Sequence, residues 1–152
     1  MYFVNRNKLI QTLDYIDGLL DTLEKQPFET KIENLGLERL AHMLIEAIID
    51  VGNMMIDGFI MRDPGSYEDI IDILVDEKVI PQQDEDEYKA VIRLRDQLVR
   101  GYLNIDHKHI HEVLTKHQTK LNNFSSHVHT YLNNELGVVN AFANDAKQDE
   151  GK

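Results

Sequence analysis

The sequence contains no cysteine, and it has little proline and little positive charge. None of its 152 residues is cysteine or tryptophan, and three are proline. Without cysteine the chain forms neither a disulfide nor a thiolate metal site, which fits a reducing compartment. It has no apolar run of about 18 residues that would span a membrane, and residues 1–6 lack the basic-then-apolar layout of a signal peptide. We therefore expect a cytoplasmic protein with no membrane segment.

Negative charge dominates the chain. With 27 acidic residues against 16 lysines and arginines, the formal net charge is −11. Proteins that bind nucleic acid broadly carry a basic face, so this composition excludes general binding along a polyanion. Any contact with RNA must then occur at a local basic site or through a partner protein.

Length and apolar periodicity predict one all-α domain. At 152 residues the chain is long enough for a single core, and its apolar residues recur at helical spacing. Asn5 is the expected N-cap of the first helix, and the stretch from Ser66 to Asp69 resembles a capping box before the third. We expect helices at about 5–24 and 34–58, a short third from 66, a fourth from about 84 into the arginine-rich stretch, and a long fifth at about 107–136. Residues 1–136 form the predicted domain, an antiparallel helical bundle, and 137–152 a disordered acidic tail.

The second predicted helix is apolar on nearly all sides. Its apolar residues run from Leu37 to Ile56 without a clear polar face. Such a helix must be buried on nearly all sides, so it is the central helix of the bundle or one shared with a second subunit. We expect both, in a homodimer formed through the second, fourth and fifth helices.

Three of the six arginines, Arg93, Arg95 and Arg100, fall within eight residues. Arginine presents a rigid fork of donors that fits phosphate or carboxylate, so this basic island in an acidic chain predicts a local anion site. The alternative is structural, because cations near a helix C-terminus are favoured by the helix dipole and pair with neighbouring acids.

The spacing of these residues limits which of them share a face. On an ideal helix Arg95 and Arg100 lie roughly 140° apart. They converge on one ligand only if the helix breaks, for which Gly101 is well placed, or if two subunits meet across a cleft. Arg95 and Tyr102, seven residues apart, are expected on the same face.

Six of the seven histidines lie between residues 107 and 129. Among His107, His109 and His111, only the first and last share a helical face, and two imidazoles make half a zinc site at most. His127 and His129 are expected in solvent. We therefore expect no metal site, and nothing in the sequence indicates a cofactor.

Three stretches carry a family resemblance over about residues 4–135. They are residues 37–53, the segment 66–70, and the segment 95–106. Together they resemble the HepT-like family of the HEPN superfamily, small all-α proteins of bacteria and archaea, and in length and layout its YutE-type branch. The last stretch is the most specific, because the family pattern there is Arg, four residues, His, one residue, Tyr. The residues that match it and its setting are Arg95, Leu98, Val99, Tyr102 and Asp106.

The resemblance implies a site for metal-independent RNA cleavage. In the family the Arg, which is Arg95 here, stabilises phosphate charge in the transition state, and the His moves protons to and from the 2′-hydroxyl and the leaving oxygen. Arg100 stands at the His position, and arginine stays protonated at any working pH. Arg100 therefore adds phosphate affinity but no base catalysis, and His107 is the nearby candidate to substitute. The resemblance also makes Tyr102 a target for AMP transfer by a partner nucleotidyltransferase antitoxin.

Two classes of function follow from these residues. The first is a HepT-like ribonuclease toxin of a toxin–antitoxin pair, with Arg93, Arg95 and Arg100 on RNA phosphate and Tyr102 beside them, its activity weakened or lost. The alternative is a non-catalytic dimer that binds a nucleotide or small anion, or a module that partners a nucleotidyltransferase.

Overall fold

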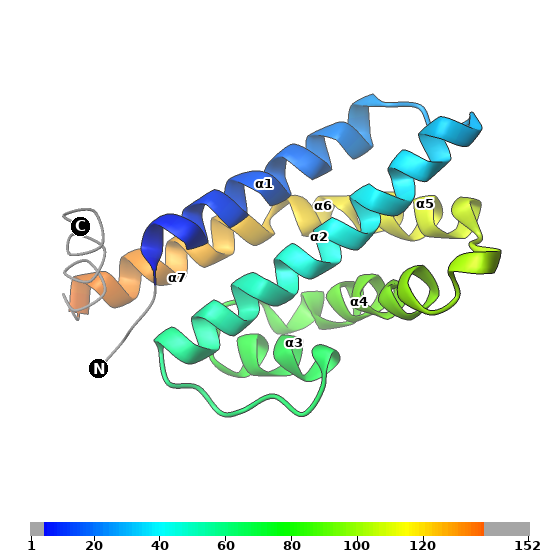
Figure 1. The fold of residues 1–152 in the computed structure, drawn as a ribbon. Coiled ribbons are helices and arrows are strands. Elements are labelled where there is room, and N and C mark those ends of the chain that lie inside the picture. Colours follow the sequence, from blue (N-terminus) through cyan, green and yellow to red (C-terminus); the bar gives the residue numbers. More distant parts are fainter. Residues whose placement is uncertain (1–4, 139–152) are drawn as a thin grey trace.

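The protein folds as a bundle of α-helices around one long central helix, α2 (Figure 1). The computed structural model describes residues 5–138, and these contain no β-strand, so the all-α prediction is confirmed. None of the helices between residues 5 and 138 has both the length and the hydropathy that a membrane span requires. The tail predicted for 137–152 lies outside the described residues, except for 137 and 138, which end the last helix. The elements are α1 (Arg6–Lys25), α2 (Lys31–Gly58), α3 (Tyr67–Asp76), the 3-10 helix η1 (Gln82–Asp84), α4 (Glu85–Val99), the 3-10 helix η2 (Tyr102–Asn104), α5 (His107–Lys116), α6 (Gln118–Asn122) and α7 (Phe124–Val138).

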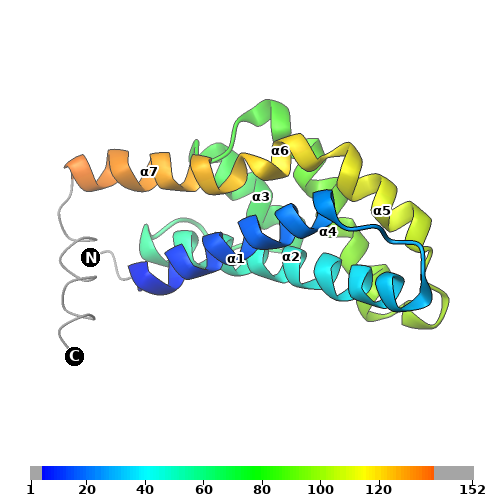
Figure 2. The same cartoon turned by 90° about the horizontal axis from the view of Figure 1, so that it is seen from above.

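Helix α2 occupies the centre because its apolar residues meet four neighbours. It packs against α1, α3, α4 and α5, and Figure 2 shows α1 running beside it. One chain already buries thirteen residues of this helix, which confirms the prediction of a central helix and accounts for its apolar sequence. Ile32 and Leu35, in its first two turns, are exposed. The homodimer stays a prediction.

Side-chain caps set where the first two helices begin. The Asn5 side-chain oxygen accepts a hydrogen bond from the Lys8 backbone N–H at 2.9 Å, as predicted. Helix α2 begins at Lys31, three residues before the predicted start. The reason is a reciprocal capping box, in which Thr30 and Glu33 each accept a hydrogen bond from the other's backbone N–H.

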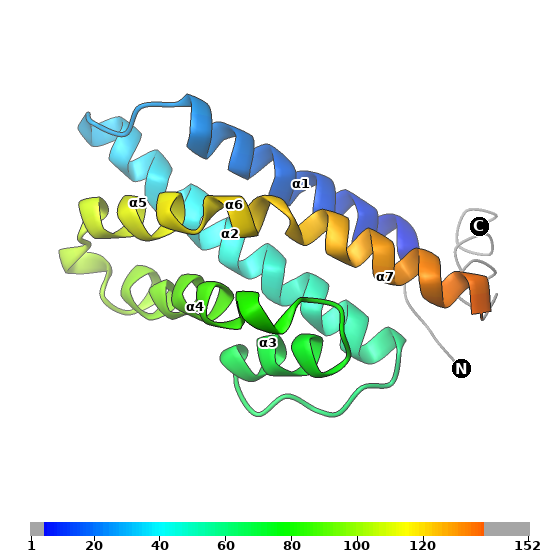
Figure 3. The ribbon, with the colours of Figure 1, turned by 180° about the vertical axis from the view of Figure 1, so that it is seen from behind.

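The prediction of a single long helix at 107–136 is wrong, because this segment forms three helices, α5, α6 and α7. The breaks fall at His117 and Asn123, where the backbone ψ angles are 6° and −7°. The side chain of Gln118 donates to the Leu20 carbonyl of α1 at 2.9 Å and holds the first break. Asparagine competes for backbone groups and so weakens a helix at the second. Figure 3 shows the three helices in succession along one side of the bundle, with α6 and α7 beside α1.

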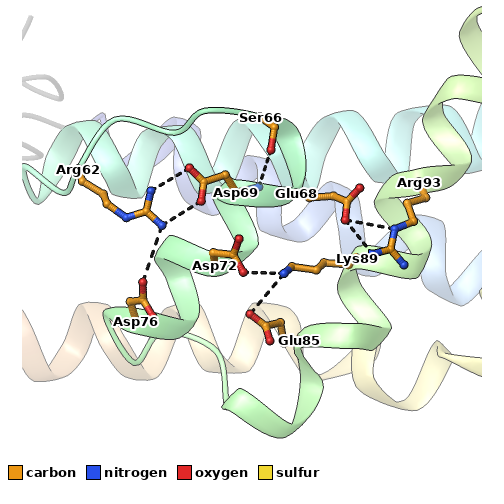
Figure 4. Close-up of polar contacts among 9 residues, drawn as sticks. All are labelled: Arg62, Ser66, Glu68, Asp69, Asp72, Asp76, Glu85, Lys89 and Arg93. Carbon is orange, nitrogen blue, oxygen red and sulfur yellow. Dashed lines mark hydrogen bonds and ion pairs between the residues drawn. The ribbon is translucent and has the colours of Figure 1, made fainter.

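Helix α3 is held by ionic contacts at its start (Figure 4). The Ser66 hydroxyl accepts from the Asp69 N–H at 3.1 Å, which forms half of the expected capping box. The Asp69 carboxylate instead accepts two hydrogen bonds from Arg62, at 2.8 and 2.9 Å, and one from the Gly65 N–H at 2.8 Å. These bonds, those from Arg62 first, lower the pKa of Asp69 well below its ordinary value.

Replacing Asp69 with Asn is expected to lower stability at neutral pH, with a difference that shrinks in acid. Because the pKa of Asp69 is lowered in the folded state, its ionised form contributes stability above the unfolded value of about 3.9. That contribution is lost as the pH falls through the folded value. Urea unfolding of both proteins should therefore diverge at neutral pH and converge as the pH falls below about 4. Asp63→Asn, at an exposed acid of the loop before α3, is the control. A gap between Asp69→Asn and wild type that did not change with pH would contradict the expectation.

Candidate functional site

The three clustered arginines line one pocket between α3 and α4. The pocket has a volume of about 300 Å³ and brings Arg93, Arg95 and Arg100 together. Helix α4 ends at Val99, and Arg100 is its C-cap. The helix break that convergence was predicted to need is therefore present, and it falls one residue before Gly101. The other lining residues are Ser66, Tyr67, Glu68, Ile92, Asp96 and Val99.

Arg95 is held more firmly than its neighbours, because two other helices contact it. Its Nε–H donates to Oε1 of Glu46 on α2 at 2.6 Å, and its guanidinium carbon lies 4.4 Å from the centroid of the Tyr67 ring on α3. The bond to Glu46 raises the pKa of Arg95. That hydrogen bond uses Nε alone, which leaves the N–H donors of the two terminal amino groups for an anion.

Arg93 and Arg100 make looser, exposed contacts. Nε and one terminal nitrogen of Arg93 both donate to the same Glu68 oxygen, at 3.1 and 2.9 Å. Figure 4 shows this pair between α4 and the start of α3. The Arg100 side chain is 85% exposed and lies 3.7 Å from Asp96. The structural alternative thus holds in part, since each arginine has an acid partner, but exposed pairs contribute no more than about 1 kcal/mol and can give way to a ligand.

Tyr102 lies apart from the arginine pocket. It belongs to η2, which follows the end of α4, and it does not line the pocket. Its expected position on the same helix face as Arg95 is wrong, because that expectation assumed a helix continuous through residue 102. The Tyr102 side chain is 63% exposed.

The histidines grouped in the sequence have separate partners in the structure. His107 Nε2 lies 2.7 Å from Oε2 of Glu38 on α2. His127 and His129, expected in solvent, are both half-buried, and His127 lies 4.0 Å from the buried carboxylate of Asp84. Across residues 5–138, no three His, Asp or Glu side chains are placed to hold a metal ion.

Sequence reasoning missed three residues next to Arg95, namely Tyr67, Glu46 and His42. Tyr67 is exposed, and its ring stacks on the guanidinium of Arg95. His42 Nε2 lies 3.6 Å from Oε1 of Glu46. The available signal was the interruption of an apolar helix by polar residues at four-residue spacing, Glu38, His42 and Glu46, which place one polar stripe on α2.

Comparisons of sequence and of structure agree on one family. Residues 9–128 match the family model described as Ribonuclease HepT-like, and the chain belongs to that family. It is 48% identical over 143 residues to the Bacillus subtilis protein described as "Putative RNase YutE", a match that covers 93% of this chain and 99% of the relative. The solved structure of the cytosolic protein YutE from Bacillus subtilis matches with a TM-score of 0.87 at 47% identity, over 90% of this chain and 96% of that one. The family predicted from the arginine motif is confirmed.

Proposed function

We propose that this chain is a HepT-like ribonuclease that binds the RNA backbone in the arginine pocket and cleaves it weakly. The observation that carries the proposal is that Arg93, Arg95 and Arg100 line one pocket in a chain of that family. The guanidinium fork fits a phosphate. The negative charge of the rest of the chain restricts RNA to this local site.

Arg95 is the proposed stabiliser of the transition state. Glu46 and Tyr67 hold its guanidinium in place, and a preorganised donor stabilises developing phosphate charge more than a mobile one does. Arg93 and Arg100 leave their exposed acid partners at small energetic cost and add phosphate affinity. Arg100 cannot take a proton from the ribose 2′-hydroxyl, because guanidinium does not deprotonate, and cleavage is therefore slow.

The proposal extends to a toxin–antitoxin pair. Tyr102 is exposed in η2, so its hydroxyl is open to an AMP-transferring partner. Exposed apolar residues support a homodimer interface near the start of α2 and η2, namely Ile32, Leu35 and Leu103. Expression of the wild type is expected to slow bacterial growth, and Arg95→Ala to relieve the effect.

Metal-free cleavage of labelled RNA tests the ribonuclease proposal. In buffer with EDTA the wild type is expected to cut slowly, and Arg100→His about tenfold faster, because an imidazole at the motif position takes and returns protons. Arg93→His is the matched control. It exchanges an arginine for a histidine in the same pocket, but away from the motif position, so its rate should not rise. A rate for Arg100→His at or below wild type would show that Arg100 does not stand in for the motif histidine.

The second candidate function is non-catalytic binding of a nucleotide or small anion. It is favoured by the pairing of each pocket arginine with a carboxylate, for which an anion can exchange. Intact RNA in the cleavage assay, together with nucleotide binding that Arg95→Ala removes, would select this function over cleavage.

A further inference from the structure

A histidine outside the family motif lies beside Arg95. His42 Nε2 is 3.6 Å from Glu46 Oε1, and the same oxygen accepts the hydrogen bond from Arg95 Nε at 2.6 Å. The imidazole and guanidinium nitrogens therefore lie no more than about 6 Å apart, the sum of those two distances. A phosphate oxygen and the neighbouring ribose 2′-oxygen are separated by less than this, so one nucleotide can contact both groups.

His42 also lies level with the motif position along the bundle. Helices α2 and α4 pack together and run antiparallel (Figure 1). Glu46 of α2 contacts Arg95 of α4, and His42 lies four residues before Glu46 on α2. Val99, next to Arg100, lies four residues after Arg95 on α4. Because the helices are antiparallel and both rise about 1.5 Å per residue, His42 and Val99 are displaced in the same direction and by the same distance. His42 of α2 therefore lies at about the same height along the bundle as residue 100 at the end of α4, the position where the family motif has its histidine.

We propose that His42 is the general base of RNA cleavage in this chain, an inference that rests on the ribonuclease function proposed above. The unprotonated ring nitrogen of His42 takes the proton of the ribose 2′-hydroxyl, the 2′-oxygen bonds to phosphorus, and the bond from phosphorus to the 5′-oxygen breaks. The 5′-oxygen takes a proton from water, and the resulting hydroxide takes the proton from the imidazolium. The products are a 2′,3′-cyclic phosphate end and a 5′-hydroxyl end.

The neighbours of His42 suit this role. The Glu46 carboxylate is at ion-pair distance from Nε2 and stabilises the imidazolium that proton transfer creates. The His42 side chain is 34% exposed, so RNA in solution can reach it. The ionisable groups near this face of α2 include Glu38, Glu46 and Asp50 of α2 itself, Lys8 and Tyr15 of α1, Tyr67 of α3, Arg95 of α4 and His107 of α5.

His107, the candidate substitute expected from sequence, is placed less well. Its Nε2 is engaged by Glu38 at 2.7 Å, two helical turns along α2 from Glu46. Arg95 is hydrogen-bonded to the other glutamate, Glu46. His107 is therefore the matched control for His42, since both pair with a glutamate of the same stripe.

The test is metal-free cleavage of labelled RNA by wild type, His42→Ala, His107→Ala and Arg95→Ala over about pH 5 to 9. His42→Ala is expected to cut about 100-fold more slowly than wild type and to lose the rise of rate with pH in the acid range. Added imidazole should restore cleavage to His42→Ala alone. RNA binding and thermal unfolding of this variant should match the wild type, and His107→Ala should keep its rate.

Each outcome decides between the roles. If His42→Ala cuts as the wild type does while Arg95→Ala does not, the base is another group, and the ribonuclease function stands without this inference. If the wild type leaves RNA intact, both the ribonuclease function and the role of His42 are overturned. A slower His42→Ala that also binds RNA weakly and ignores imidazole shows a structural role, which overturns the inference. His42→Gln, which keeps a hydrogen-bonding side chain but takes no proton, repeats the comparison should the alanine variant not fold.

Discussion

Arg95→Ala is expected to slow metal-free RNA cleavage by about 100- to 1000-fold, the usual effect of removing one preorganised donor to transition-state charge. The expectation is this large because Glu46 and Tyr67 fix the guanidinium before RNA arrives. Its N–H groups thus need little reorganisation when phosphate charge develops. Single-turnover cleavage of an end-labelled RNA measures the rate constant of the chemical step directly.

Two further variants separate position from charge. Arg95→Lys keeps the positive charge but loses the planar fork and much of the stacking on Tyr67, so it should recover only a small part of the rate. Arg39→Ala removes one exposed arginine of α2 outside the arginine pocket and should cut like the wild type. Equal losses in Arg39→Ala and Arg95→Ala would mean that net charge, rather than a built site, governs cleavage.

Local chemistry made much of the fold predictable. The Asn5 cap and the apolar periodicity of α1, α2 and α4 depend on neighbouring residues, which a sequence displays directly. The divided fifth helix was not predictable in this way. Its apolar stripe continues through the breaks, with Leu114, Leu121 and Phe124 all buried. Periodicity alone therefore predicts one continuous helix. The first break depends on a contact between Gln118 and Leu20, 98 residues apart.

In the candidate site, too, the contacts between neighbouring residues were predictable and the contacts distant in sequence were not. The family motif identified Arg95 and Arg100, because these residues lie close together in sequence. The partners that orient Arg95 come from elsewhere, since Glu46 is 49 residues away and Tyr67 belongs to α3. The sequence does not indicate that His42, on a mostly apolar helix, belongs to the site, because only tertiary packing places it beside Arg95.

The close approach of α3 to α2 depends on Gly52. A Cβ at this position would overlap Cγ2 of Ile70 on α3 and would lie 3.6 Å from Leu74 Cδ1. Ile70 is one turn after Tyr67 on the same helix. The absence of a side chain at Gly52 therefore lets α3 lie close to α2, and it links core packing to the arginine pocket, which Tyr67 of α3 lines.

Gly52→Ala is expected to destabilise the protein by about 2 kcal/mol, because overpacking of a filled core outweighs the gain in helix propensity. The midpoint of thermal unfolding should fall by roughly 4–8 °C. Gly36→Ala is the matched control, since it lies in the same helix with no atom near its added Cβ, and it should stabilise by about 0.5–1 kcal/mol. Adding Ile70→Ala to Gly52→Ala removes the overlapping methyl group, so the loss in the double variant should be smaller than the sum of the single losses by about 1 kcal/mol. Additive losses, or a stabilised Gly52→Ala, would show that α3 moves aside freely and that Gly52 does not set the distance between the two helices.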